Sequence, residues 1–117
     1  MRGLHTIKVG EKSIDLYFNT WVLKRFCKLN GEISLTQFLE LLQTGLTVDH
    51  LTSLLLCAAE YIFVKDKKQS PYNDIDASDW IDELGGINGA AFVELLGSAA
   101  KSLMDGGAKG EGEKKSQ

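Results

Sequence analysis

The chain has 117 residues, of which 44% are hydrophobic and 25% are charged, and its formal net charge is −3. This length supports one core and one domain, and the acidic balance argues against a nucleic-acid-binding surface, which is normally basic. No apolar run approaches the ~20 residues that cross a bilayer. The first ten residues lack the apolar block of a secretory signal, so we expect a cytoplasmic protein that does not bind membranes.

A β-hairpin is predicted at about residues 5–18. The segments "TIKV" and "SIDLYF" alternate apolar and polar residues, and Gly10 lies at the bend between them. A two-stranded hairpin is only marginally stable in water, so its apolar face must rest on another part of the domain. The residues expected on that face are Ile7, Val9, Ile14, Leu16 and Phe18.

About five helices are predicted to follow, because five capping residues each sit inside a hydrophobic pair. Such a pair joins the residue before the cap to the fourth helical residue. Glycines near positions 31, 45, 85–86 and 106–107 mark the expected helix ends. The caps, with their pairs, are Asn19 (Phe18–Leu23), Ser34 (Ile33–Phe38), Thr47 (Leu46–Leu51), Asp76 (Ile75–Trp80) and Asn88 (Ile87–Phe92).

The acidic stretch "NDIDASDWIDELGG" at 73–86 has the composition of a calcium loop but not its spacing. A calcium loop needs glycine at its sixth position and a bidentate glutamate at its twelfth. Counted from Asp74, these positions hold Asp79 and Gly85. We therefore interpret the stretch as a helix start with Asp76 as the N-cap, where carboxylates suit the positive end of the helix dipole.

The segment "VDHLTSLLLCAAEYIFV" predicts the central helix of the domain. Its main apolar stripe holds Val48, Leu51, Leu55, Ala58 and Ile62, and a second patch on another side holds Leu56 and Phe63. A helix that is apolar beyond one stripe is usually covered on several sides. The predicted fold is thus mainly α, with a small N-terminal hairpin and about five helices packed around this one in a single domain at 1–105. The Gly-, Lys- and Glu-rich segment 106–117 is predicted to be a flexible tail.

No residue pattern predicts catalysis, a cofactor or a metal. Cys27 and Cys57 lie far apart among apolar neighbours, which is typical of buried free thiols rather than of a zinc site. Neither His5 nor His50 has a cysteine or serine at a recognisable spacing. "GGINGAAF" has no lysine and no β-α-β context, so it is a weak phosphate-binding candidate. We expect a protein that is not an enzyme.

Three residues are candidates for binding a partner protein: Trp21, Leu56 and Phe63. Trp21 lies off the apolar stripe of its helix, so it either anchors a contact or closes the edge of the core beneath the hairpin. The surplus apolar surface also favours self-association. The alternative class is a small helical nucleic-acid-binding regulator, for which the basic cluster "LKRFCK" at 23–28 is the support. We interpret that cluster instead as a solvated helix face.

The order of these segments resembles the tail assembly chaperones of long-tailed bacteriophages. The resemblance covers about residues 5–105. It is carried by "IKVGEKSIDLYFNTWVLKRFCKLNG", "SLTQFLELL", "LTSLLLCAAEYIF" and "DWIDELGG", none of which is an invariant signature.

The resemblance implies a non-enzymatic protein of the infected or prophage-carrying bacterium. It would coat the helical tape measure protein and keep it soluble until tail tube subunits polymerise around it. Many members of the family also have a longer form made by ribosomal frameshifting. Lys114 and Lys115 suit that picture if their codons form a slippery run of adenines.

Overall fold

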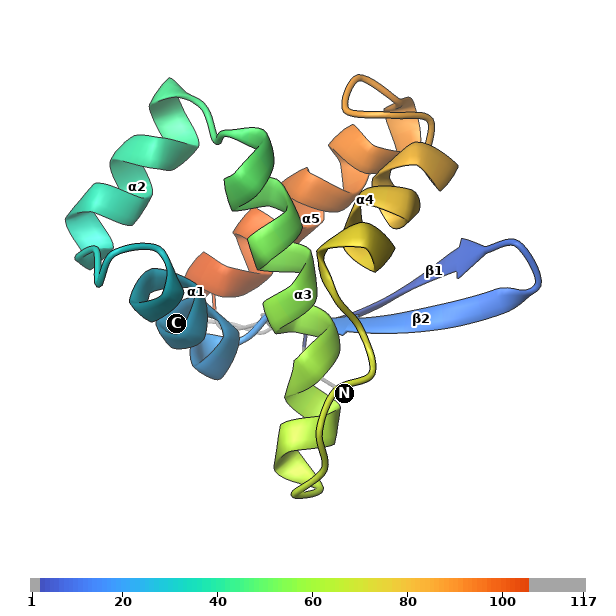
Figure 1. Cartoon of the computed structure of the whole chain (residues 1–117). Coiled ribbons are helices and arrows are strands. Elements are labelled where there is room, and N and C mark those ends of the chain that lie inside the picture. The colour runs from blue at the N-terminus through green and yellow to red at the C-terminus, as the bar shows by residue number, and fades with distance from the viewer. Residues whose placement is uncertain (1–2, 106–117) are drawn as a thin grey trace.

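The computed structural model describes residues 3–105, which form a two-stranded antiparallel hairpin followed by five helices (Figure 1). This confirms the predicted fold class. The flexible tail, the lysine pair and the helix end predicted at 106–117 lie outside the described residues. The elements are β1 (Leu4–Val9), β2 (Lys12–Tyr17), α1 (Thr20–Leu29), α2 (Leu35–Thr44), α3 (Val48–Lys65), α4 (Asp74–Glu83) and α5 (Ala90–Asp105).

The hairpin closes in a two-residue turn, because Val9 pairs with Lys12. Gly10 in this turn has a φ of 65°, a left-handed conformation that glycine adopts at little steric cost. One face of the hairpin is buried, as expected for a sheet too small to be stable alone. The buried side chains of that face are Ile7, Ile14, Leu16 and Phe18, whereas Val9 is only half-buried.

The first three helices begin at the predicted caps. The Asn19 side chain accepts a hydrogen bond from the backbone N–H of Val22 at 3.0 Å. Ser34 and Thr47 each form a reciprocal capping box with the third helical residue, which is Gln37 in α2 and His50 in α3. These bonds satisfy backbone N–H groups that have no partner inside the helix.

The predicted cap of the fourth helix is wrong, although the stretch is a helix start. Asn73 is the cap: its side chain accepts from the N–H of Asp76 at 3.1 Å, and the Asp76 carboxylate accepts from the N–H of Asn73 at 2.9 Å. Asp76 therefore belongs to the first turn of α4. As a consequence Ile75 does not pair with Trp80; Ile75 is 70% exposed, whereas Trp80 is 3% exposed.

The fifth helix also begins later than predicted. The carbonyl of Gly89 accepts the first helical hydrogen bond, from the N–H of Val93 at 2.9 Å, and α5 begins at Ala90. Asn88 thus lies one residue before the position of the cap, and Ile87 is 43% exposed rather than packed as the partner of Phe92.

Helix α3 occupies the centre of the fold, as predicted. It contacts β2, α1 and α4, and α5 passes behind it in the view of Figure 1. Val48 is an exception to the predicted stripe, because it is 55% exposed at the beginning of the helix. The buried residues of α3 face several directions and are Leu51, Thr52, Leu54, Leu55, Cys57, Ala58 and Ala59.

Candidate partner-binding surface

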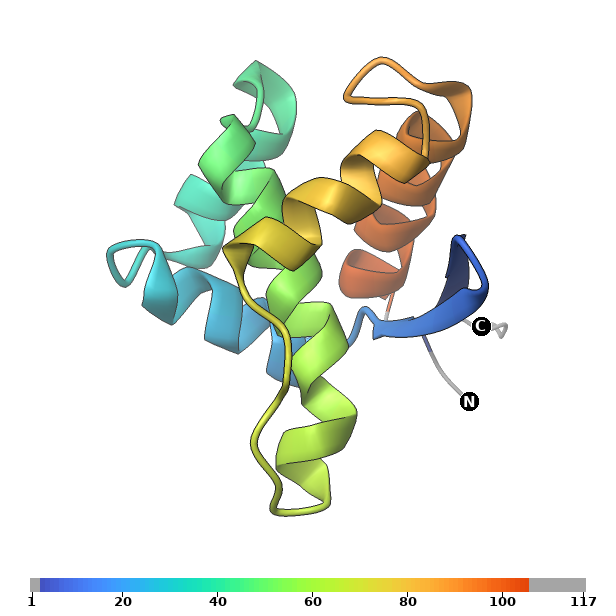
Figure 2. The same ribbon diagram turned by 45° about the vertical axis from the view of Figure 1, so that its right-hand side comes forward.

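The C-terminal end of α3 is much less covered than its middle. Residues 61–64, here called the α3 tip, are Tyr61, Ile62, Phe63 and Val64. The first three are half-buried and Val64 is 43% exposed. Figures 1 and 2 show that the last turns of α3 project beyond the other helices. Four consecutive apolar or aromatic side chains are therefore left incompletely buried at a protruding point of the domain.

One side of the α3 tip is flanked by aromatic residues from the N-terminal part of the chain. The ring of Tyr61 lies 5.7 Å from that of Trp21 and 5.3 Å from that of Tyr17, centroid to centroid. The Lys65 ammonium lies 5.8 Å from the centre of the Tyr61 ring, within range of a cation–π interaction. Trp21 is half-buried and packs against the core, so it closes the core edge and still presents part of its ring.

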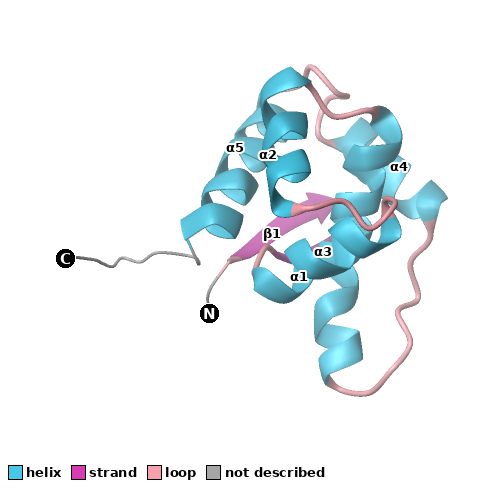
Figure 3. Cartoon of the chain, turned by 90° about the vertical axis from the view of Figure 1, so that its left-hand side faces the viewer, coloured by secondary structure: helices cyan, strands magenta, loops and turns pink. Residues whose placement is uncertain are grey.

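The loop that returns from α3 to α4 flanks another side of the α3 tip. This loop runs back along the helix end, as Figure 3 shows. Its Tyr72 ring meets the Phe63 ring edge-on at 5.8 Å and the Trp80 ring edge-on at 5.0 Å. Trp80 is buried, so Tyr72 connects the partly exposed Phe63 to the core.

The structure brings two of the three predicted partner-binding residues to the α3 tip. Trp21 contacts it through Tyr61, and Phe63 belongs to it. Leu56 lies about two helical turns earlier, is half-buried and packs against the core. The heptad spacing of Leu56 and Phe63 predicted that they form one apolar patch apart from the main stripe. The structure does not show such a patch, because Leu56 packs against the core.

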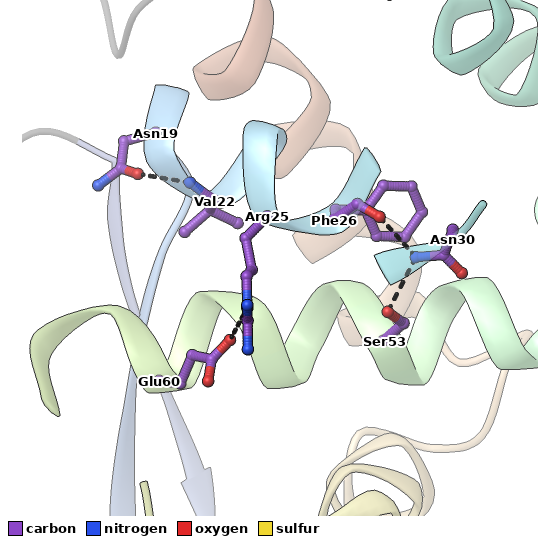
Figure 4. Close-up of polar contacts among 7 residues, drawn as sticks. All are labelled: Asn19, Val22, Arg25, Phe26, Asn30, Ser53 and Glu60. Carbon is purple, nitrogen blue, oxygen red and sulfur yellow. Dashed lines mark hydrogen bonds and ion pairs between the residues drawn. The ribbon is translucent and has the colours of Figure 1, made fainter. Parts of the chain in front are cut away.

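Leu56 lines a cleft of about 370 Å³ between α1, α3 and the loop before α4. Two polar contacts join α1 and its C-cap residue, Asn30, to α3 beside this cleft, as Figure 4 shows. Arg25 Nε donates to Glu60 Oε1 at 3.0 Å, and Asn30 Nδ2 donates to Ser53 Oγ at 3.0 Å. The cleft thus has a polar wall and is less suited to an apolar side chain than the α3 tip is.

The predicted solvated face of α1 is only partly correct. Lys24 and Lys28 are exposed, but Arg25 is committed to its ion pair with Glu60. Sequence reasoning missed this pair, because nothing in the spacing of the two residues, 35 positions apart, indicates contact.

A second apolar surface, which sequence reasoning also missed, lies between α1 and the start of α2. This α1–α2 groove has a volume of about 560 Å³. Leu35, the first residue of α2, is 53% exposed here although it is apolar. The only sequence signal was the basic pair on α1 beside apolar neighbours. The groove is lined by the apolar residues Leu23, Cys27, Ile33 and Leu35 and by Thr20, Lys24, Lys28 and Glu32.

The surroundings of the two cysteines and two histidines do not activate them for chemistry. Burial, together with the nearby Glu60 carboxylate, raises the pKa of Cys57 to about 12, and burial raises the pKa of Cys27. Neither thiol is therefore activated as a thiolate nucleophile. Burial lowers the pKa of His5, whose Nε2 lies 3.3 Å from Ser102 Oγ, and His50 Nδ1 accepts from the N–H of Thr47 in the capping box.

Within residues 3–105, no group of three or more His, Cys, Asp or Glu side chains is placed to hold a metal ion. None of the helices described is both long enough and apolar enough to span a membrane. Comparison of the chain with protein-family models, with curated proteins and with solved structures gives no match.

Proposed function

We propose that this protein is a tail assembly chaperone of a long-tailed bacteriophage. In this proposal it binds the tape measure protein in the cytoplasm of the infected or prophage-carrying bacterium and keeps it soluble until tail tube subunits displace it. It uses no cofactor or metal and catalyses no reaction. The support is the order of elements that carries the resemblance, together with one surface, the α3 tip.

The α3 tip carries the proposal because it places four adjacent apolar or aromatic side chains, none of them fully buried, at a protruding helix end. Aromatic side chains dominate the energetics of protein interfaces, and two of them, Tyr61 and Phe63, lie here with Trp21 adjacent. A tape measure protein is a long helix with an apolar face. Such a helix can lay that face against the tip between the Trp21 side and the Tyr72 side.

The size of the tip suits a chaperone that must release its client. Four side chains that are already partly buried offer little additional apolar area, so each contact is weak. Weak sites repeated along one client would let tube subunits displace the copies one at a time. The basic Lys65 beside Tyr61 would favour a client with acidic residues at the edge of its apolar face.

The test is coexpression with the tape measure protein encoded beside this chain in its own genome. We expect the wild-type chain to move most of the client into the soluble fraction. Phe63→Asp should return the client to the solubility it has alone, because a carboxylate would have to be desolvated at the interface. The circular dichroism of purified Phe63→Asp should keep its helical content.

The matched control is Val93→Asp, which places the same charge at an apolar helix position that is 55% exposed on α5. This variant should solubilise the client as the wild type does. A client that is insoluble with the wild type, or equally soluble with Phe63→Asp, contradicts the proposal. Leu56→Asp is a poorer test, because Leu56 packs against the core and its substitution also costs stability.

The alternative, a nucleic-acid-binding regulator, has weaker support. Of the basic cluster on α1, Arg25 is paired with Glu60, which leaves Lys24 and Lys28. Salt-dependent retardation of duplex DNA by the purified chain would favour this alternative over the chaperone.

A further inference from the structure

We propose that the α1–α2 groove of one chain binds helix α4 of a second copy, so that chains associate head to tail. The two surfaces carry opposite charges, and each exposes an apolar side chain, Leu35 in the groove and Ile75 on α4. This inference concerns self-association and does not depend on the proposed chaperone function.

The donor surface is the outer face of α4, which begins with Ile75 in the first turn of the helix. Ile75 is 70% exposed, the most exposed of the large hydrophobic residues described. On a helix the positions four and seven residues later lie on the same face; these are Asp79 and Asp82, and both are exposed. The other face of α4 is buried through Ala77, Trp80 and Ile81. The outer face therefore carries one exposed apolar side chain, Ile75, next to the carboxylates of Asp79 and Asp82.

The acceptor surface has the opposite character. Four apolar side chains line the α1–α2 groove, and the two lysines that also line it, Lys24 and Lys28 of α1, are exposed. Helix α1 contains no acidic residue, and α4 contains no basic residue. Within the described residues the one ion pair is Arg25–Glu60, which joins α1 to α3. The lysines of the groove and the carboxylates of α4 are thus available for contacts between chains.

The occupant of the groove must come from a second chain. Helices α1 and α4 both pack on α3, but from different sides, as Figure 2 shows. The α4 helix of one chain cannot reach its own groove without leaving the core, where Trp80 and Ile81 are buried. Because the two surfaces differ, the contact is heterologous, and each added chain leaves one free groove and one free α4.

Glu32 opposes this contact, and the direction in which its substitution changes association distinguishes a charged contact from an apolar one. Its carboxylate lines the same groove and would repel the aspartates of the incoming helix. Removal of this charge in Glu32→Gln should therefore strengthen association, whereas a merely apolar contact would be indifferent to it. High salt should weaken association, because the attraction is between exposed charges.

The experiment is sedimentation velocity of the full chain from micromolar to millimolar concentration, at low and at high salt. We expect species larger than a dimer at high concentration and low salt. Ile75→Ser should weaken association about tenfold or more, since it removes the apolar side chain that the contact buries. Lys24→Glu should weaken it as well, and Val93→Ser, at another exposed apolar position, should leave it unchanged.

A mixing experiment separates a head-to-tail contact from a symmetric one. Lys24→Glu/Lys28→Glu destroys the groove but keeps α4, and Ile75→Ser/Asp79→Lys destroys the α4 face but keeps the groove. Each variant alone should be monomeric, and an equimolar mixture should form a dimer that grows no further. A symmetric contact between two α4 faces, or between two grooves, would let one of the two variants associate on its own and would overturn the proposal.

Labelling of Cys27 gives an independent measure, because this half-buried thiol lies in the groove. The rate of its reaction with a maleimide should fall as the wild-type concentration rises and should be constant for Ile75→Ser. A wild-type chain that stays monomeric at all concentrations contradicts the proposal. Association that survives both Ile75→Ser and Lys24→Glu contradicts it too.

Discussion

The middle and the tip of α3 belong to one continuous helix but have different surroundings. In the middle, Leu55 and Ala58 are fully buried beneath α1, α4 and the hairpin. At the tip, Phe63 and Val64 keep part of their surface in solvent, although they are no less apolar. The difference shows that hydrophobicity along a helix does not by itself separate core from binding surface. Whether a turn of the helix is core or binding surface depends on which other elements cover it.

The largest expected effect is on the buried side of this comparison. Leu55→Ala should lower the free energy of unfolding by about 2–5 kcal/mol, because it removes buried methyl groups and leaves a cavity. Val64→Ala at the tip should cost less than about 1 kcal/mol, since Val64 is 43% exposed. Urea denaturation followed by circular dichroism measures both values. Equal losses for the two variants would show that the tip is core.

A smaller effect is expected where the loop before α4 holds the tip. Tyr72→Leu keeps apolar volume but removes the edge-on ring contacts to Phe63 and Trp80. Aromatic pairs of this kind contribute about 0.5–1.5 kcal/mol each. Loss of both pairs should therefore lower the free energy of unfolding by about 1–3 kcal/mol. Amide exchange in residues 61–64 should quicken while exchange in the middle of α3 changes little. Uniform acceleration along the helix would mean that the tip and the middle open together.

Much of the fold could be predicted because its signals are local. The hairpin turn at Gly10 and the caps Asn19, Ser34 and Thr47 each depend on a few neighbouring residues. The start of α4 could not be predicted in the same way, because "NDID" contains three residues that can cap a helix, Asn73, Asp74 and Asp76. The reciprocal bonds between Asn73 and Asp76 favour the first of them. That shift of three residues turns Ile75 from an expected core contact into an exposed side chain.

The candidate surfaces were harder to predict, since they depend on contacts between distant segments. The sequence places Trp21 and Phe63 on different helices and cannot show that Trp21 lies beside the end of α3, to which Phe63 belongs. Their placement depends on Tyr61 facing Trp21 and on Tyr72 folding back over Phe63. The exposure of Leu35 likewise depends on how α2 packs, since Phe38, one turn later, is fully buried against Phe26.

Hydrogen–deuterium exchange of the full chain, alone and with the tape measure protein, tests the central claim most directly. The account predicts that the client slows exchange in residues 61–64 and in the first turns of α1, around Trp21. Exchange in α5 should stay as it is in the free chain. Protection confined to other elements, or no protection in the presence of a soluble client, would contradict the assignment of the α3 tip as the binding surface.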